Sequence, residues 1–372
     1  MIVGYDATTV TGQLSGVGYY TARLLSSLAN GAGHGVVDRI VVLSNREVSV
    51  EPGPRVTLYE GQRFPVRSVW MQFVLPRILR RLRPDVVHYT NYLAPVRSQV
   101  PYVVSVHDMS VELMPQYHTL KKRLLTSRLV PIVARRASLV LTPSENTRRD
   151  VIRLLGLDPG RVRVIPYAPG PTFRPDATGP DRLRTLGLTG PYFLYVGTLE
   201  PRKNLARALR GFARVARSLP EHRFVIVGQR GWKYDDVLKE ASSDALRGRV
   251  DLLGYVAEAD LPALYSHATA FVYPSLYEGF GLPVVEAMAC GTPVLTSRSS
   301  SLTEIAEGSA LLVDPLDEAA LAEGLAALAT DEALRADLRA RGLEKAASFT
   351  WERTGRETAQ AYLEVYEDRR AR

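Results

Sequence analysis

The chain has 372 residues, a formal net charge of +8 at pH 7 and one cysteine. Its length exceeds what a single hydrophobic core usually takes and suits two domains. The lone Cys290 excludes an internal disulfide, and no Cys/His cluster predicts structural zinc. No run of 18 apolar residues predicts a membrane-spanning helix, and the first residues predict a strand rather than a signal peptide. We therefore expect a protein of the reducing cytoplasm.

The positive charge is concentrated in the first half of the chain. Residues 1–174 carry 23 Lys+Arg against 11 Asp+Glu, and the remainder carries 24 against 28. Basic and apolar residues alternate at helical spacing in 67–83 and 121–136, which allows either core helices with solvated basic faces or helices that contact an anionic membrane. Nucleic-acid binding is disfavoured because no recognised binding motif accompanies the charge. The candidates for membrane contact are Arg80, Arg81, Arg83, Lys121, Lys122 and Arg123.

Short apolar runs alternate with helical segments along the first half, which predicts a doubly wound parallel sheet. The expected strands are 2–5, 40–43, 56–58, 86–88, 102–106, 139–142 and 162–166. A helix is expected over 19–29, others within 67–83 and 121–136, and one over 147–155 with Ser144 or Asn146 as its cap.

Three positions in this half are candidates for ligand contact. Gly16 and Gly18 lie between the first strand and the next helix, where they favour either close approach of a phosphate or sugar, or simply a flexible turn. His107 follows a strand and precedes Asp108, a carboxylate that can orient it. His88 ends the preceding strand without such a neighbour, and we expect it to be structural.

The second half begins with a strand over 192–197, which runs into V-G-T-L-E-P-R-K-N. Arg202 and Lys203 stand just before a helix that begins near Asn204. Two fixed cations beside a helix N-terminus suit a diphosphate and can stabilise a departing nucleoside diphosphate. Further strands are expected over 224–228, 250–254 and 268–272 and from 294, with one long helical region over 317–347 and a last helix over 351–368.

The most informative stretch is residues 273–293, Y-P-S-L-Y-E-G-F-G-L-P-V-V-E-A-M-A-C-G-T-P. It predicts a loop at the carboxyl end of a parallel strand, followed by a helix from near Pro283, which is where open α/β sheets bind ligands. Gly279 and Gly281 let a ligand approach the backbone. Glu278 and Glu286, with seven residues between them, can accept hydrogen bonds from sugar or ribose hydroxyls.

This stretch resembles the E-x7-E region of retaining glycosyltransferases of family 4, which have the GT-B fold, and E-P-R-K-N resembles the same family. The resemblance implies an α/β protein with two Rossmann-like doubly wound domains facing across a cleft. Residues 1–172 would form the acceptor-side domain and 190–350 the nucleotide-sugar domain, with a linker over 169–190. The last helix, within 351–372, would cross back to the first domain. One departure is clear, because Pro166-Tyr167-Ala168 stands where family members usually have P-N-G.

The resemblance also implies residue roles. Arg202 and Lys203 would grip the donor diphosphate, Glu286 the ribose and Glu278 the sugar, and His107 would touch the sugar from the other domain. Gly16 and Gly18 would lie where donor and acceptor meet, and the turn at Tyr255 and Val256 would cradle the base. The donor site would be completed by Gly197, Gly279, Phe280, Gly281 and Leu282, with backbone N–H groups near Phe280 and Gly281 as donors.

The implied reaction is hexosyl transfer from a nucleotide diphosphate sugar to a glycan or lipid-linked acceptor, with GDP-mannose favoured. No D-x-D motif is present, so we expect neither a metal nor a cofactor. Two alternatives stay open: a GT-B epimerase of nucleotide sugars, and a sugar-nucleotide binding protein without catalysis. We expect a cytoplasmic protein, and peripheral contact with the inner face of the membrane is a further hypothesis.

Overall fold

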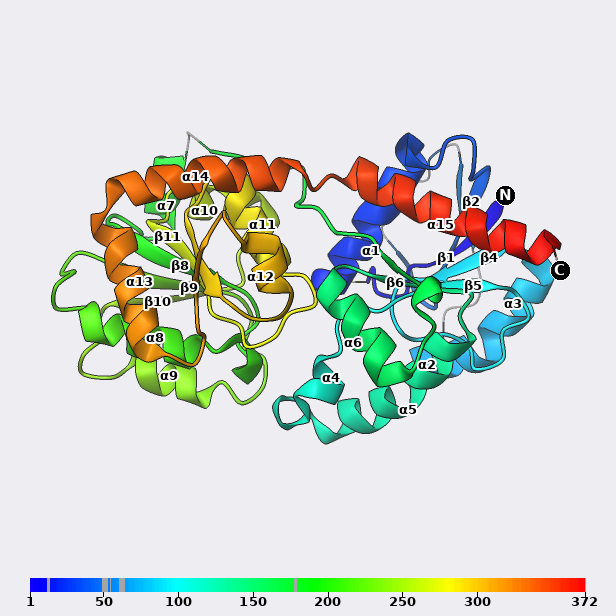
Figure 1. The fold of residues 1–372 in the computed structure, drawn as a ribbon, viewed down its shortest axis with the longest axis horizontal. Helices are drawn as coiled ribbons and strands as arrows, with labels where there is room; N and C mark the ends of the chain where they lie inside the picture. Colours follow the sequence, from blue (N-terminus) through cyan, green and yellow to red (C-terminus); the bar gives the residue numbers. More distant parts are fainter. Residues whose placement is uncertain (12–13, 49–52, 54, 60–63, 177–178, 372) are drawn as a thin grey trace. The chain divides into compact units, whose positions relative to one another are not determined.

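The computed structural model describes residues 1–11, 14–48, 53, 55–59, 64–176 and 179–371. The chain divides into two compact units, coloured along the sequence in Figure 1. The first unit holds Met1–Tyr167 and Thr350–Arg372, and the second holds Ala168–Phe349. The segment that the sequence assigned to a linker, 169–190, belongs to the second unit and contains helix α7 (Gly179–Thr185).

The first unit is built on a seven-stranded parallel sheet in the order β3-β2-β1-β4-β5-β6-β7. Its strands are β1 (Ile2–Asp6), β2 (Arg39–Leu43), β3 (Val56–Leu58), β4 (Val86–Tyr89), β5 (Tyr102–Ser105), β6 (Leu139–Thr142) and β7 (Val162–Val164). Every residue of β4, β5 and β6 is buried, as a parallel sheet covered on both faces requires. The expected strands are therefore present, with ends that shift by one or two residues.

The helices of this unit are α1 (Gly16–Ser27), α2 (Arg67–Val69), α3 (Leu75–Leu82), α4 (Ser110–Leu113), α5 (Leu120–Arg136), α6 (Glu145–Leu155) and α15 (Trp351–Ala371). Helix α1 begins at Gly16, three residues before the expected start, so both glycines lie in its first turn. Between α2 and α3 the chain forms a π-helical segment, Trp70–Val74. Ser144 is the cap of α6, because its Oγ accepts the Thr147 N–H at 3.1 Å.

Helix α15 belongs to the first unit although it is last in the chain. It packs against α1 and against strands β4 and β5, as Figure 1 shows in red. The Ser27 hydroxyl donates to the Trp351 carbonyl at 2.6 Å, and the Thr354 hydroxyl donates to the Pro166 carbonyl at 2.7 Å. A Cβ at Gly355 would lie 2.4 Å from Ser27 Oγ, so the two helices meet where no side chain fits.

The second unit repeats this plan with six parallel strands in the order β10-β9-β8-β11-β12-β13. They are β8 (Tyr192–Val196), β9 (Arg223–Val227), β10 (Val250–Gly254), β11 (Ala270–Tyr273), β12 (Val294–Ser297) and β13 (Leu311–Val313). The strand order reverses between β8 and β11, as it does between β1 and β4 in the first unit. Ligands of open α/β sheets bind at such points, at the carboxyl ends of the strands.

Helices cover both faces of the second sheet. They are α8 (Leu205–Val215), α9 (Asp235–Ala241), α10 (Leu261–Ser266), α11 (Leu282–Ala289), α12 (Ser300–Ala306), α13 (Glu318–Thr330) and α14 (Glu332–Ala347). In Figure 1, α8, α9 and α13 gather on one side of the strands and α11 and α12 on the other. The helical region expected over 317–347 is two helices, because Asp331 interrupts it and caps α14 by accepting the Leu334 N–H at 2.9 Å.

Candidate functional site

Three neighbouring strands of the second sheet, β8, β9 and β10, end at or just before glycines that take conformations few other residues adopt. Gly197, Gly228 and Gly254 have φ of 156°, 145° and 69°. A Cβ at Gly228 would lie 2.0 Å from the Gly197 carbonyl oxygen, so the backbones of adjacent strand ends touch there. Tyr255, which follows Gly254, has 53% of its surface exposed. This edge therefore combines bare backbone with an accessible aromatic ring.

At the point where the strand order reverses lies a group of four ionisable side chains, which we call the charged cluster: Glu200, Arg202, Lys203 and Glu278. The turn after β8 supplies the first three, and the loop after β11 supplies Glu278. Lys203 Nζ lies 2.6 Å from Glu278 Oε1, and Arg202 Nη1 lies 3.1 Å from Glu278 Oε2. Arg202 Nη2 also bonds Glu200 Oε1 at 2.7 Å. The sequence predicted Arg202, Lys203 and Glu278 separately, and the structure joins them with Glu200.

Neutral groups hold the cluster in place. Glu278 Oε1 accepts the Ser275 hydroxyl at 2.6 Å and the Tyr273 hydroxyl at 3.2 Å. The Glu278 N–H donates to Ser300 Oγ at 2.9 Å, so the backbone of the loop is fixed as well. The Asn204 amide donates to the carbonyls of two other loops, and this residue takes the left-handed conformation at φ 60° to begin α8. These contacts fix the loop geometry before any ligand binds.

The cluster sets the ionisation of Glu278. Burial raises the pKa of this carboxyl, but the charges of Arg202 and Lys203 and their hydrogen bonds outweigh burial and lower it to about 2. Burial lowers the pKa of Lys203, and the charge of Glu278 opposes that change. Glu278 is therefore an ionised carboxylate at neutral pH, and it balances part of the charge of the two cations.

The remaining predicted donor residues lie on or next to α11. Gly281 takes φ 107° at the cap of this helix, and a Cβ there would lie 2.6 Å from Leu302 Cδ2. Leu282 begins the helix, and Phe280 is buried against Phe349, with 5.6 Å between ring centroids. Glu286 is half-buried, and its Oε2 accepts the Tyr265 hydroxyl at 3.3 Å. The structure thus places Glu286 on the predicted helix, where the Tyr265 hydroxyl is one of its partners.

In the first unit, His107 follows β5 and is held by two hydrogen bonds. Its Nε2 lies 2.8 Å from the Thr90 carbonyl, and its Nδ1 lies 2.6 Å from the Tyr167 hydroxyl. A carbonyl only accepts, so Nε2 carries the proton and Nδ1 accepts from Tyr167. Burial lowers the pKa of His107 despite Thr90 and Asp108, which favours this neutral form. Tyr167 occupies the position where the sequence departs from the family pattern, and contact of His107 with a sugar stays a prediction.

His88 is structural, as expected. It is fully buried, with Nδ1 2.7 Å from the Tyr362 hydroxyl of α15 and Nε2 2.9 Å from Ser105 Oγ. Ser105 Oγ in turn lies 2.9 Å from the Tyr20 hydroxyl of α1. Burial lowers the pKa of His88 to about 3, so the ring is neutral. This network ties α1 and α15 to the sheet.

The two glycines of α1 differ in their surroundings. A Cβ at Gly18 would lie 2.9 Å from the Thr9 carbonyl oxygen, so close packing accounts for this glycine. At Gly16 no atom lies within 4 Å of such a Cβ, and space beside the helix start is open. Packing therefore explains one glycine, and ligand approach stays a prediction for the other.

Within the described ranges, no three His, Cys, Asp or Glu side chains are grouped so that they could hold a metal ion. None of the helices in the described part of the chain is long and apolar enough to cross a membrane. Cys290, at the end of α11, is buried, and burial raises the pKa of its thiol to about 12.

Comparison with known proteins decides the family. Residues 14–168 match Glycosyltransferase Family 4, and residues 184–345 match Glycosyl transferases group 1. The chain is 32% identical to the O-antigen chain mannosyltransferase B of Escherichia coli, over 94% of this chain and 96% of that protein. The chain belongs to the glycosyltransferases. The resemblance found in the sequence is therefore confirmed, and this chain is an enzyme of that family.

Solved structures show the same fold. Sucrose-phosphate synthase from Thermosynechococcus elongatus superposes with a TM-score of 0.77 at 22% identity, over 99% of both chains. Anabaena HepE, solved with UDP and glucose, superposes with a TM-score of 0.74 at 20% identity, over 97% of this chain and 98% of its own. Together with the two parallel Rossmann-like sheets, these likenesses identify this glycosyltransferase as GT-B in fold.

Sequence reasoning missed several members of the site. Glu200 was given no role in E-P-R-K-N, although it bonds Arg202. Tyr273 and Ser275 were given no role either, although both donate to Glu278. The strand order could have found Tyr273 and Ser275, because residues at the end of β11 must face the turn that follows β8.

Proposed function

We propose that this glycosyltransferase moves a mannosyl unit from GDP-mannose to a glycan or lipid-linked acceptor, with retention at the anomeric carbon. The observation that carries the donor site is the charged cluster, in which two cations meet a carboxylate where the strand order of the second sheet reverses. The choice of mannose rests on the likeness to the O-antigen chain mannosyltransferase of Escherichia coli.

The geometry supports a division of labour within the cluster. Among the described contacts, Glu278 Oε1 accepts bonds from Lys203, Tyr273 and Ser275, whereas Oε2 has one cation, Arg202, at 3.1 Å. Oε2 is therefore the oxygen with more room for a further donor. We assign that place to a hydroxyl of the donor sugar. Glu278 then keeps its bonds to both cations while it orients the sugar.

Arg202 and Lys203 would meet the diphosphate on the side away from Glu278. Glu200 and Glu278 offset the positive charges of Arg202 and Lys203, so the cluster by itself is close to neutral. The two cations would stabilise the leaving diphosphate without a divalent cation, so we propose metal-independent transfer. In a front-face route the leaving phosphate itself helps to deprotonate the acceptor hydroxyl, and no covalent nucleophile is needed.

The test uses the purified enzyme with GDP-mannose or UDP-glucose and a short mannoside acceptor. We expect GDP to be released only when the acceptor is present, and the reaction to continue in EDTA. NMR should show that the new glycosidic bond is α-linked. Release of nucleotide diphosphate from UDP-glucose alone would overturn the donor assignment. Conversion of the donor without any acceptor would favour the epimerase alternative, and binding without turnover of any donor would favour the non-catalytic one.

The acceptor side rests on the first unit. Helix α5 exposes Leu120, Leu124 and Leu125 beside the exposed side chains of Lys122 and Arg123. A mixed apolar and basic face of this kind fits an anionic membrane that presents a lipid-linked acceptor. The Lys121 side chain, also a candidate, lies outside the described part of the structure.

Co-sedimentation with anionic liposomes tests this contact. We expect binding at low salt that weakens at high salt and in a Lys121/Lys122/Arg123 triple Ala variant, since each basic residue near such a surface contributes about 1 kcal/mol. Binding that ignores both salt and the substitutions, or no binding at low salt, would leave a soluble acceptor as the proposal.

A further inference from the structure

A pocket of about 520 Å³ lies in the first unit, among residues for which neither the family nor the proposed reaction gives a role. It is bounded by the start of β5, the junction between α5 and β6, the start of β7 and the last turns of α15. These are the amino ends of the strands, whereas His107 follows the carboxyl end of β5. The pocket is therefore separate from the predicted contact of the first unit with donor and acceptor.

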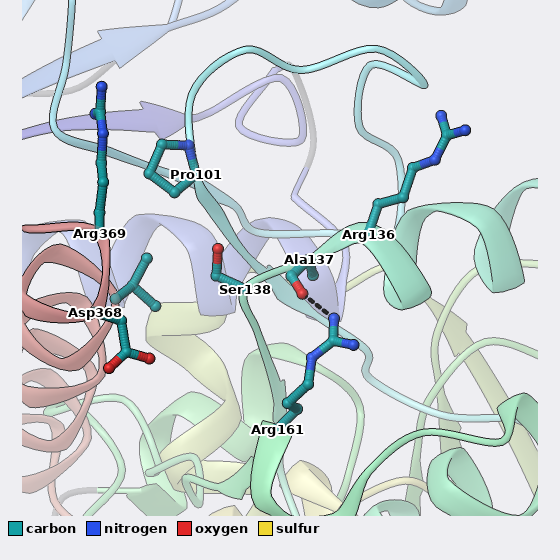
Figure 2. A pocket seen from close by; sticks show the side chains of 8 residues that line it. Pro101, Arg136, Ala137, Ser138, Arg161, Asp368 and Arg369 are labelled. Carbon is teal, nitrogen blue, oxygen red and sulfur yellow. Dashed lines mark hydrogen bonds between the residues drawn. The ribbon is translucent and has the colours of Figure 1, made fainter. Parts of the chain in front are cut away.

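Three arginines line this pocket: Arg136, Arg161 and Arg369. Figure 2 shows Arg136 and Arg369 at the two sides of the pocket, with Ser138 between them and Arg161 directed at the Ala137 carbonyl. The lining also includes one carboxylate, Asp368. Three guanidinium groups and one carboxylate leave the lining with two positive charges.

The described contacts of these arginines are all with uncharged backbone carbonyls. Arg136 donates to Val96, and Arg369 donates to Asp85 O at 3.4 Å. Arg161 donates to the Arg135 carbonyl at 2.9 Å and to that of Ala137, and so caps the end of α5. A carbonyl fixes a guanidinium without neutralising it, and each guanidinium has five donors in a planar fork. The arginines are therefore held in position, and they keep their positive charge and N–H groups that can bind a ligand.

A neighbouring arginine, in contrast, forms an ion pair with a carboxylate. Arg163, two residues after Arg161 and within β7, pairs with Glu364 of α15 at 3.3 Å. It does not line the pocket. Helix α15 thus gives Arg163 a carboxylate partner. Within the described residues, no such ion pair forms at the three lining arginines, so the pocket keeps a net positive charge.

We propose that this pocket binds a phosphate monoester on a small organic group. A monoester carries about 1.5 to 2 negative charges at pH 7, which matches the lining, and arginine forks suit its oxygens. The volume exceeds the space of a phosphate alone, and Ser138, Pro101 and Val365 offer a hydroxyl and apolar surface for an attached glycerol or sugar. The proposal does not rest on the identity of the donor or acceptor.

Binding here would also fasten α15. Asp368 and Arg369 come from the last turns of that helix, and Arg136 and Arg161 come from the sheet side. A phosphate held between Arg369 and either of the others would join the end of α15 to the end of α5 or to the start of β7. Amide exchange in 362–371 should therefore slow when the pocket is filled.

The experiment uses the full-length chain and compares two double variants of equal charge. Arg136→Gln/Arg369→Gln removes two lining arginines, and Arg163→Gln/Arg370→Gln removes two nearby arginines that do not line the pocket. The probe in solution is glycerol 3-phosphate. The probe on a membrane is phosphatidic acid, the same head group on two acyl chains, in phosphatidylcholine vesicles. The readouts are protection of individual arginines from phenylglyoxal, measured by mass spectrometry, and amide exchange in 362–371.

We expect the probe to protect Arg136 and Arg369 but not Arg370, and affinity to fall about tenfold or more in the lining variant only, since that variant loses two donors of charge-assisted hydrogen bonds. Protection by glycerol 3-phosphate identifies a soluble ligand, and protection by vesicles alone identifies a lipid head group. No protection by either probe, or equal loss in both double variants, overturns the proposal. The donor site is intact in both variants, so failure of the proposed function would not produce this pattern.

Discussion

The two units carry different chemistry at equivalent places in the same topology. In both sheets the strand order reverses beside the first strand of the unit, between β1 and β4 and between β8 and β11. The second unit fills that place with the charged cluster. The first unit has the buried Asp6 at the end of β1, with Arg67 Nη2 3.6 Å from its carboxylate, and a neutral network that joins His88, Ser105 and Tyr20. The same topology therefore carries two cations and two carboxylates in one unit and an ion pair beside a neutral network in the other.

The largest expected effect comes from breaking the charged cluster at its centre. In Glu278→Gln, two buried cations lose their shared carboxylate, and we expect the free energy of unfolding to fall by about 3–5 kcal/mol. Turnover should fall by about a hundredfold or more, whereas affinity for GDP should not fall, because a negative charge near the diphosphate is gone. Urea denaturation, donor kinetics and calorimetry measure the three quantities.

The matched control for that variant is Glu307→Gln, at an exposed position that follows α12. It should leave all three quantities unchanged. A Glu278→Gln enzyme that loses GDP affinity as much as it loses turnover would show that our separation of sugar and diphosphate roles is wrong.

The second effect concerns the diphosphate itself. Lys203→Met should weaken binding of GDP by about 1.5–3 kcal/mol, because a hydrogen-bonding cation is lost while Arg202 and Glu278 keep their pair. Calorimetry with GDP and UDP measures it. Lys239→Met, which removes an exposed lysine from α9 of the same unit, is the control. If the two variants bound GDP with equal affinity, Lys203 would not belong to the diphosphate site.

Low pH should affect the stability of the two units differently, through His88 in the first and Glu278 in the second. His88 has its pKa lowered from 6.5 to about 3 by burial, so the unfolded chain binds a proton in that interval and the folded unit does not. Stability of the first unit should thus be full above pH 6.5 and fall as the pH drops, by about 1.4 kcal/mol per pH unit. Glu278, lowered from 4.5 to about 2, stabilises the second unit above pH 4.5 and loses that effect as the pH falls toward 2.

Hydrogen exchange at pH 7 and pH 5, corrected for intrinsic rates, reports on each unit in the intact chain. Peptides from β4 and α15 should lose more protection at pH 5 than peptides from β11 and α11. Half-buried His222 adds a smaller effect of the same sign to the second unit. In His88→Gln, the difference between the units in protection lost at pH 5 should shrink. If that difference were unchanged, His88 would not be the source of the acid sensitivity of the first unit.

The smallest effect is expected at Glu286, whose carboxylate accepts the Tyr265 hydroxyl at 3.3 Å. If it accepts ribose hydroxyls, Glu286→Ala should weaken GDP binding by about 0.5–1.5 kcal/mol, with a smaller change in turnover. Tyr265→Phe serves as a control for the tyrosine contact alone. A loss of turnover larger than the loss of affinity would move Glu286 from the ribose to the reacting sugar.

The sequence was sufficient for the strands and for the residue types of the donor site. Buried parallel strands are apolar runs, and the pattern around Glu278 is specific enough to name the family. Contacts between distant segments could not be predicted, because they depend on which strands become neighbours. The pairing of Lys203 with Glu278 is of this kind, as is the bond between His107 and Tyr167. The break at Asp331 was missed because helical composition continues on both sides of it.

The position of α15 has a consequence for how the chain is made. The first unit takes its last helix from residues that follow the whole second unit, so the α1 surface around Ser27 and the His88 ring stay uncovered until translation reaches Tyr362. The second unit is one continuous segment and can fold as soon as it leaves the ribosome, whereas domains that come first in a chain usually fold first. We therefore expect the second unit to complete its fold before the first. A chain that stops before Trp351 would keep the complete charged cluster and lack the helix that closes its first unit.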